Sequence, residues 1–346
     1  MRLAIIGAGP AGLAAAHALS DAAEVTVFEK SRGVSGRAAT RWRDAPAPDG
    51  SDARWRYDHG AQYLSPEPDS PAADLVRAVA GDAVVEIDGA VWPFDADGTI
   101  QPDHARPGGT RWTFPGGIAD LGRFLRDATP GLDLRRQTRA STLDRTADSW
   151  ALGGDDGPLG TFDAVLMTAP APQTAELLGT EAGADLADAL AGASYRAQFT
   201  VVWAFHAALG RPADVYALVN AGGGHNVAWV AVESDKPGRA PDGSTLLLAQ
   251  MSDGWTRAHY DDARADVIDA ATHSVIDVWG ALPAPAWTDT QRWRYALPDG
   301  AADTARLDDA ADRGLFFAGD WTAGQGRVHL ALEEGLAAAG RIRQRL

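Results

Sequence analysis

Residues 5–12 read Ile-Ile-Gly-Ala-Gly-Pro-Ala-Gly, and the strand-like run of residues 2–6 leads into them. A glycine-rich turn between a strand and a helix predicts a dinucleotide-binding fold. Gly7 permits the tight turn, Gly9 allows close approach to a pyrophosphate, and Gly12 allows the helix to pack on the strand. The helix N-terminus then offers free N–H groups to the phosphates.

A second strand-like run, residues 24–29, ends in Glu29. A carboxylate at this place can accept hydrogen bonds from both ribose hydroxyls, and it would repel a 2′-phosphate. The sequence therefore favours FAD or NAD over NADP as the bound dinucleotide.

The composition sets outer limits on the function. The chain has 346 residues, a net charge of −16 and no cysteine, and its mean hydropathy is −0.20. Redox chemistry must therefore come from a cofactor, and the negative charge argues against nucleic acid and anionic membranes as partners. We see no basic-then-apolar leader, no apolar run of about 18 residues and no histidine spacing typical of a metal site. We expect a cytoplasmic protein without a metal.

Two further segments point to a flavin. Residues 32–37, Arg-Gly-Val-Ser-Gly-Arg, place Gly36 and Arg37 where they can approach a pyrophosphate that the first helix already binds. In residues 57–63, Tyr-Asp-His-Gly-Ala-Gln-Tyr, the two small residues would let the backbone lie against a flat ring. Gln62 could then hydrogen-bond the polar edge of that ring.

A third segment lies near the end of the chain. Residues 314–321, Gly-Leu-Phe-Phe-Ala-Gly-Asp-Trp, predict a buried strand followed by Asp320, which can accept a hydrogen bond from a ribityl hydroxyl. We expect a last helix over residues 328–343, with its N-terminus near Arg327 and Val328. The positive end of that helix would point at the flavin N1 and C2 carbonyl, where it favours the reduced anion.

The remaining patterns predict a second sheet and its helices. Strands are expected at residues 200–205, 227–232 and 245–251, with helices at 181–190 and 261–279. Residues 83–87 and 90–94 flank the turn dipeptide Asp88-Gly89, which predicts a β-hairpin.

The fold class that follows is α/β, with a Rossmann-like FAD-binding domain interleaved with a mixed-sheet α+β substrate domain. The predicted FAD-binding domain comprises residues 1–66, 108–170 and 290–346, and the predicted substrate-binding domain comprises residues 67–107 and 171–289.

The sequence resembles bacterial-type members of the renalase family, within the amine-oxidase-like flavoproteins that share the p-hydroxybenzoate hydroxylase architecture. The resemblance covers nearly the whole chain. Its narrower motifs are Asp58-His-Gly-Ala-Gln-Tyr63, Asp235-Lys-Pro-Gly-Arg239 and Gln291-Arg-Trp-Arg-Tyr-Ala296. Residues 7–12, 28–37, 318–321 and 326–328 are common to many flavoproteins. The chain departs from the family pattern at Ser35, where glycine is common, at Asp235, where serine is usual, and at His329, where an acid is frequent.

The resemblance implies noncovalent FAD. It implies that Ala11, Glu29, Lys30, Arg37, Gln62 and Tyr63 contact the cofactor, that Ala140 lies near the adenine and that Val328 lies near the isoalloxazine. Together with the motif residues, the predicted cofactor-binding set is Gly7, Gly9, Pro10, Ala11, Gly12, Glu29, Lys30, Gly36, Arg37, Gly60, Ala61, Gln62, Tyr63, Ala140, Gly319, Asp320, Arg327 and Val328.

The activity implied by the resemblance is the oxidation of 2- and 6-dihydro isomers of NAD(P) to NAD(P)+, with O2 reduced to H2O2. Hydride transfer from such a ring releases no substrate proton, so the site must stack and orient the ring rather than supply a base. The substrate-face candidates are Trp293, Tyr295, Trp229, Trp321 and His329. Arg239 and Arg294 can either bind substrate phosphates or pair with the abundant aspartates.

Three alternatives stay open from the sequence. Amine-oxidising relatives usually place a lysine to hold a water near the flavin, and Lys236 is the candidate here because Lys30 belongs to the ribose strand. A carotenoid-type desaturase is disfavoured because no amphipathic membrane-docking stretch is evident. The third alternative is a flavin-binding redox sensor without turnover.

Overall fold

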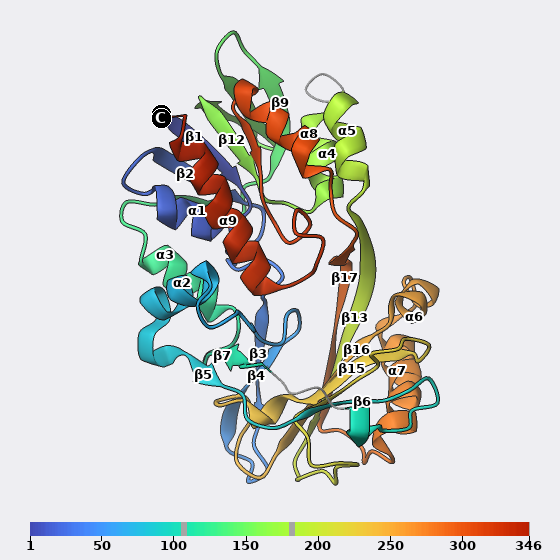
Figure 1. The fold of residues 1–346 in the computed structure, drawn as a ribbon. Helices are drawn as coiled ribbons and strands as arrows, with labels where there is room; N and C mark the ends of the chain where they lie inside the picture. Colours follow the sequence, from blue (N-terminus) through green and yellow to red (C-terminus); the bar gives the residue numbers. More distant parts are fainter. Residues whose placement is uncertain (105–108, 180–183, 346) are drawn as a thin grey trace.

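A five-stranded parallel sheet forms one half of the molecule (Figure 1). The computed structural model describes residues 1–104, 109–179 and 184–345. The strand order is β18-β12-β1-β2-β8, so the first two strands of the sequence lie near the centre of the sheet. The strands are β1 (Arg2–Ile6), β2 (Glu24–Glu29), β8 (Asp133–Arg136), β12 (Ala164–Met167) and β18 (Leu315–Phe317).

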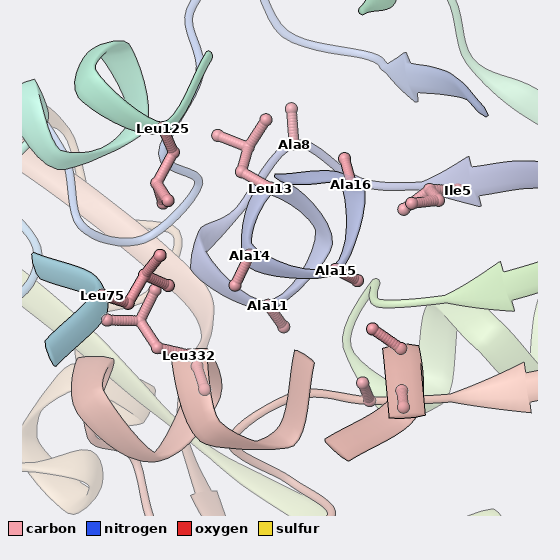
Figure 2. Close-up of a cluster of buried hydrophobic side chains, with 14 of the residues drawn as sticks. Ile5, Ala8, Ala11, Leu13, Ala14, Ala15, Ala16, Leu75, Leu125 and Leu332 are labelled. Atoms are coloured by element: carbon pink, nitrogen blue, oxygen red, sulfur yellow. The ribbon is translucent and has the colours of Figure 1, made fainter. Parts of the chain in front are cut away.

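Each face of the parallel sheet has its own covering layer. Because side chains alternate along a strand, Leu3 and Ile5 face one core while Ala4 and Ile6 face another. Figure 2 shows the first core, which α1 fills with a run of alanines against Leu75, Leu125 and Leu332 of neighbouring helices. This layer contains α1 (Pro10–Leu19), α2 (Pro71–Ala80), α3 (Asp120–Asp127) and α9 (Val328–Arg343). The other layer contains α4 (Ala171–Leu178), α5 (Ala184–Ala191), α8 (Thr304–Asp308) and the antiparallel sheet of β9 (Ala140–Arg145), β10 (Trp150–Gly154) and β11 (Gly157–Phe162).

A six-stranded mixed sheet forms the other half, in the order β17-β13-β16-β15-β14-β6. Strands β13, β15 and β16 and helix α7 lie where the sequence predicts them, whereas residues 181–183 of the predicted helix 181–190 lie outside the described residues. The elements of this half are β6 (Val91–Pro93), β13 (Ser194–Phe205), β14 (Ala217–Val219), β15 (Val227–Val232), β16 (Thr245–Met251), β17 (Trp287–Asp299), α6 (Asp253–Ala258) and α7 (Arg264–Trp279).

Both faces of the mixed sheet are also covered. Phe199, Val201 and Trp203 of β13 pack towards α7, whereas Val202 and Ala204 pack towards an antiparallel hairpin of β3 (Thr40–Pro46) and β4 (Asp52–Asp58). This hairpin comes from the N-terminal part of the chain, so it connects the two halves.

Strands β13 and β17 run from one half to the other as a long antiparallel pair (Figure 1). Strand β17 therefore belongs to the mixed sheet, although the third segment of the predicted FAD-binding domain, residues 290–346, includes most of it. Helix α2 packs in the first core of the parallel sheet, and α4 and α5 pack in the second. The predicted division assigned these three helices to the substrate domain.

The predicted hairpin of residues 83–94 is wrong. A turn is present, since Gly89 has a φ of 97°, but the strands that flank it separate. Strand β5 (Val85–Glu86) pairs with β7 (Trp112–Thr113), and β6 pairs with β14. The turn dipeptide specifies a local change of direction, whereas tertiary packing selects the strand partners.

The short 3-10 helices are η1 (Gly81–Ala83), η2 (Pro102–His104), η3 (Glu233–Asp235) and η4 (Asp309–Arg313). Among the described residues, no helix combines the length and apolarity needed to cross a bilayer.

The crossing of α1 and α9 gives the first prediction. A Cβ at Gly335 would lie 2.2 Å from the Ala11 carbonyl oxygen, whereas a Cβ at Gly340 of the same helix would meet nothing within 4 Å. We expect Gly335→Ala to lower the free energy of unfolding by about 1–3 kcal/mol through overpacking. Gly340→Ala should raise it by up to about 1 kcal/mol, because alanine favours the helix. Urea unfolding of both variants checks this, and equal effects at the two positions would contradict it.

Candidate active site

The glycine turn has the geometry that the sequence predicts. Gly7 has a φ of 113°, and a Cβ at Gly12 would lie 2.1 Å from the Gly7 carbonyl oxygen, so the helix packs directly on the turn. A Cβ at Gly9 would meet nothing within 4 Å. Sequence reasoning missed Thr168, whose hydroxyl donates to the Ile6 carbonyl at 2.9 Å and fixes the end of β1. A polar residue directly after the buried run of β12 was the available signal.

Glu29 lies beside this turn at the carboxyl end of β2. Its carboxylate is buried and accepts hydrogen bonds from the Ala8 N–H at 3.0 Å and the Ser31 N–H at 2.7 Å. The Thr138 N–H donates to the Glu29 carbonyl, which brings the strand that begins at Ala140 next to β2. The predicted ribose and adenine residues thus lie on neighbouring segments. Lys30, which follows Glu29, is exposed.

The loop of residues 32–36 folds back onto the glycine turn. The Ser35 N–H donates to the Ala8 carbonyl at 2.7 Å, and a Cβ at Gly36 would lie 3.3 Å from the Gly9 Cα. Ser35 has a φ of 80°, a left-handed conformation in which glycine is favoured. Its buried hydroxyl has no hydrogen-bond partner among the described residues.

Arg37 and Asp320, both predicted to bind the cofactor, contact each other at 2.6 Å. The Arg37 guanidinium also donates to the Ala296 carbonyl of β17 at 3.1 Å and lies over the Tyr195 ring. The arrangement brings the 32–37 loop, the segment after β18 and the mixed sheet to one point. Gly319 comes directly before Asp320, and a Cβ there would lie 2.6 Å from the Trp321 indole nitrogen.

Gly60 is required by the protein backbone itself. A Cβ there would lie 1.9 Å from the Arg37 carbonyl oxygen, and the Ala61 N–H donates to that same oxygen at 3.0 Å. This contact requires a glycine at position 60 independently of any ring that lies against the segment. The Gln62 amide nitrogen donates to the Asp58 and Gly60 carbonyls, so its N–H groups are already bonded.

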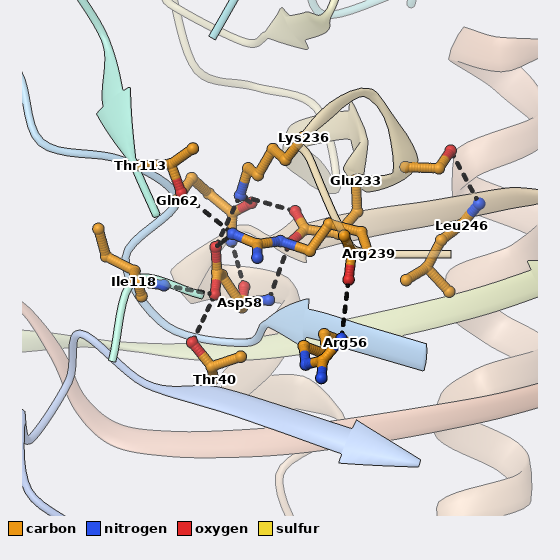
Figure 3. Close-up of polar contacts among 12 residues, drawn as sticks. Thr40, Arg56, Asp58, Gln62, Thr113, Ile118, Glu233, Lys236, Arg239 and Leu246 are labelled. Carbon is orange, nitrogen blue, oxygen red and sulfur yellow. Dashed lines mark hydrogen bonds and ion pairs between the residues drawn. The ribbon is translucent and has the colours of Figure 1, made fainter. Parts of the chain in front are cut away.

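Four ionisable side chains are fully buried beside this segment: Asp58, Glu233, Lys236 and Arg239 (Figure 3). The ammonium of Lys236 lies 3.0 Å from Asp58 and 2.7 Å from Glu233. The guanidinium of Arg239 lies 2.8 Å from Asp58 and 3.1 Å from Glu233. Each of the two basic side chains thus contacts both carboxyl groups. The further partners of this buried ion cluster are Thr40, Gln62, Thr113, Phe114, Pro115 and Ile118.

Burial and the neighbouring cations shift the pKa values of the two buried carboxyl groups in opposite directions. Burial alone raises the pKa of Asp58, but Lys236 and Arg239 outweigh it and lower that pKa to about 2. Burial raises the pKa of Glu233, and Lys236 offsets part of this rise. Sequence reasoning assigned Arg239 to substrate phosphates or aspartate pairing, and the structure places it in the second role.

The aromatic candidates lie in different surroundings. The Trp293 ring stacks on His59 at 5.4 Å between ring centroids, and its indole N–H donates to the His59 carbonyl at 2.8 Å. Trp229 lies against Tyr63 at 6.0 Å. Tyr295 packs edge-on against Tyr195 at 5.5 Å, in the second core of the parallel sheet. Trp321 is fully buried in that same core, so we assign it to packing.

Helix α9 begins at Val328, as predicted, and no side chain caps its N-terminus. Arg327 occupies the cap position, and His329 is partly buried in the first turn. Burial lowers the pKa of His329, and Arg327 adds to this effect. The first turn thus presents uncapped N–H groups and a neutral imidazole.

These features fit a dinucleotide. Gly9 leaves open space at the uncapped start of α1, the Ser35 hydroxyl lacks a partner among the described residues, and Glu29 lies at the end of β2.

Comparison with known proteins then decides the family, since the model of the flavin-containing amine oxidoreductases matches residues 89–343. The chain belongs to this family. A model of the NAD(P)-binding Rossmann-like domain matches residues 5–79. The predictions of a Rossmann-like α/β fold and of FAD as cofactor are confirmed, and the prediction of renalase is confirmed only as far as this wider family.

Solved structures with the same fold have diverse activities. The chain resembles a putative protoporphyrinogen oxidase from Exiguobacterium sp. 255-15, with a TM-score of 0.83, 16% identity and coverage of 100% and 99% of the two chains. It resembles putrescine oxidase bound to putrescine, with a TM-score of 0.73, 14% identity and full coverage of both chains. It also resembles reduced UDP-galactopyranose mutase, with a TM-score of 0.76, 13% identity and coverage of 100% and 94%. Identities this low establish the fold alone.

Removing one cation from the buried ion cluster gives the second prediction. Lys236→Met leaves a buried carboxylate uncompensated, so we expect it to lower the free energy of unfolding by about 3–5 kcal/mol. Arg54→Met is the matched control, because Arg54 pairs with Asp44 at 2.8 Å but both side chains are exposed. It should cost no more than about 1 kcal/mol. Denaturant unfolding of the two variants tests this, and similar losses would contradict the role of burial.

The titration of His59 gives the third prediction. Burial lowers the pKa of His59 to about 4 from 6.5, and Arg41 adds to this effect. Because His59 binds a proton more tightly in the unfolded chain, protonation favours unfolding. The contribution of His59 to the free energy of unfolding is therefore fully present above pH 6.5 and is lost as the pH falls towards 4. The full effect is about 3 kcal/mol. Unfolding free energies measured at several values between pH 4 and 7 should rise less steeply with pH in His59→Phe, which keeps a ring against Trp293. An unchanged slope would show that His59 titrates normally.

Proposed function

We propose that the protein is an FAD-dependent oxidase that converts 2- and 6-dihydro isomers of NAD(P) to NAD(P)+, with O2 reduced to H2O2. The observation that carries this proposal is the burial of the Lys236 ammonium within the ion cluster. Its ammonium donates to Asp58 at 3.0 Å and to Gln62 at 3.4 Å, and it forms an ion pair with Glu233 at 2.7 Å. The side chain is fully buried and surrounded by these three groups, which disfavours the task of holding a water beside the flavin that the lysine of amine-oxidising relatives usually performs.

The acid–base groups support the same choice. An amine reaches its oxidase mostly protonated and must lose a proton, whereas a dihydronicotinamide loses only a hydride. With a pKa of about 4, His59 is too weak a base to deprotonate an ammonium. The lowered pKa of His329 has the same consequence.

The aromatic and cationic side chains suit a flat, phosphorylated substrate. Trp293 and Trp229 are both partly exposed and offer indole faces for stacking. Arg294 and Arg111 lie against the rings of Tyr295 and Tyr63, and within the described ranges neither has a carboxylate at ion-pair distance. In a chain of net charge −16, such unpaired guanidiniums are available for a diphosphate.

The proposed cofactor site uses the residues predicted for it. The start of α1 and Arg37 would hold the pyrophosphate, Glu29 would hold the ribose, and residues 58–63 and the start of α9 would meet the ring system. Bound FAD supplies the two-electron acceptor and its reoxidation by O2. The task of the protein side chains is to stack the substrate ring, orient it and exclude water.

The family itself favours a second candidate, a flavin amine oxidase, because the matching model is that of flavin-containing amine oxidoreductases and putrescine oxidase shares the fold. On this hypothesis a proton acceptor other than His59 and His329 would have to deprotonate the substrate ammonium.

One experiment separates the candidates and gives the fourth prediction. The FAD-loaded protein is mixed without oxygen with 2- or 6-dihydro NAD(P), ordinary 4-dihydro NADH or putrescine, and loss of the flavin absorption is followed. We expect the 2- and 6-isomers to react on the order of a hundredfold faster than 4-dihydro NADH, because only selected ring carbons can approach the acceptor. Fast reduction by putrescine alone would establish the amine oxidase. Reduction by none of them would favour a redox sensor.

A further inference from the structure

Side chains from outside the segment hold the backbone of residues 58–63. The His59 carbonyl accepts hydrogen bonds from the Thr200 hydroxyl at 2.8 Å and from the Trp293 indole at 2.8 Å. The Gly60 carbonyl accepts one from the Gln250 amide at 2.7 Å. Two consecutive carbonyls therefore depend on β13, β16 and β17, all of which belong to the mixed sheet.

The register of the sheet explains this arrangement. Thr200 and Gln250 are direct partners in the antiparallel β13–β16 ladder, so their side chains share one face. Val202 and Leu248 continue that face and pack against Trp55 and Tyr57 of β4. The segment that follows β4 thus lies on the polar end of an otherwise apolar sheet face.

The same segment is tied to the predicted phosphate-binding loop. The Ala61 N–H donates to the Arg37 carbonyl, and the Arg37 guanidinium donates to the Ala296 carbonyl of β17. Strand β17 therefore contacts residues 58–63 through Trp293 and the 32–37 loop through Ala296. These hydrogen bonds therefore link β17 to residues 58–63, residues 58–63 to the 32–37 loop, and that loop back to β17.

We propose that Thr200 and Gln250 are positioning residues for FAD, although neither lies in a segment predicted to touch it. They fix the carbonyls of His59 and Gly60, so the mixed sheet sets how tightly and in what surroundings the cofactor ring is held. The inference rests on the placement of residues 58–63 beside FAD given in the proposed function. Loss of one donor leaves each carbonyl with a single partner, Trp293 for His59 and Gln62 for Gly60, so the segment is held less firmly.

The test uses Thr200→Val and Gln250→Leu in the full-length protein, with Thr245→Val as the matched control. Thr245 is also buried on the mixed sheet, and its hydroxyl donates to the Ala207 carbonyl at 2.9 Å, in a turn far along the chain from residues 58–63. We expect the FAD dissociation constant to rise about three- to tenfold in the first two variants. We also expect the visible absorption band of bound FAD to shift. The control should lose comparable stability in denaturant with neither change.

Thr200→Ser restores the hydroxyl and should return both readouts to those of the unchanged protein. If Gln250→Leu does not fold, the pair Thr200→Val and Thr200→Ser still tests the proposal. Unchanged FAD affinity and spectrum in Thr200→Val would overturn it, as would equal changes in Thr245→Val. Failure of the unchanged protein to bind FAD would instead contradict the proposed function, so the two failures are distinguishable.

Discussion

Asp58, Glu233, Lys236 and Arg239 occupy a place where three parts of the chain meet: the end of β4, the loop that follows β7 and the turn that includes η3. Burying each ion separately would be prohibitive, so the cluster forms only when all three parts are in position. It also bonds to the start of the segment proposed to meet the cofactor. The local order of that segment therefore depends on the packing between the two halves of the molecule.

The long pair β13–β17 supplies the second connection between the halves. Strand β17 pairs with β13 in the mixed sheet, while its Trp293 donates to the His59 carbonyl and its Ala296 carbonyl accepts from Arg37. A substrate that stacks on Trp293 would therefore touch the same strand that holds Arg37. In the proposed function, substrate and cofactor would both contact β17, and we would then expect their binding free energies to be coupled.

The buried state of Lys236 also bears on how function diverges within the family. A fold shared by an oxidase of putrescine and a mutase of a sugar nucleotide does not fix the chemistry, which depends on the groups that reach the reacting atoms. Here Lys236, the candidate for the lysine of amine-oxidising relatives, is fully buried and forms ion pairs with Asp58 and Glu233. These ion pairs make Lys236 a counter-ion of two buried carboxyl groups, which is the basis for preferring the proposed function over amine oxidation.

The sequence alone determined the dinucleotide fold, because residues 5–12 and Glu29 act over short distances whose geometry follows from backbone conformation. It also determined the start of α9 at Val328, since helical periodicity is local. Only the tertiary structure decided the strand partners around Gly89, the contact that requires Gly60 and the pairing of Lys236. Each depends on a partner outside the local sequence, Arg37 for Gly60, Asp58 for Lys236 and β14 for β6, which a local pattern cannot specify. A buried charge looks the same in sequence as an exposed one, and only packing shows which partner compensates it.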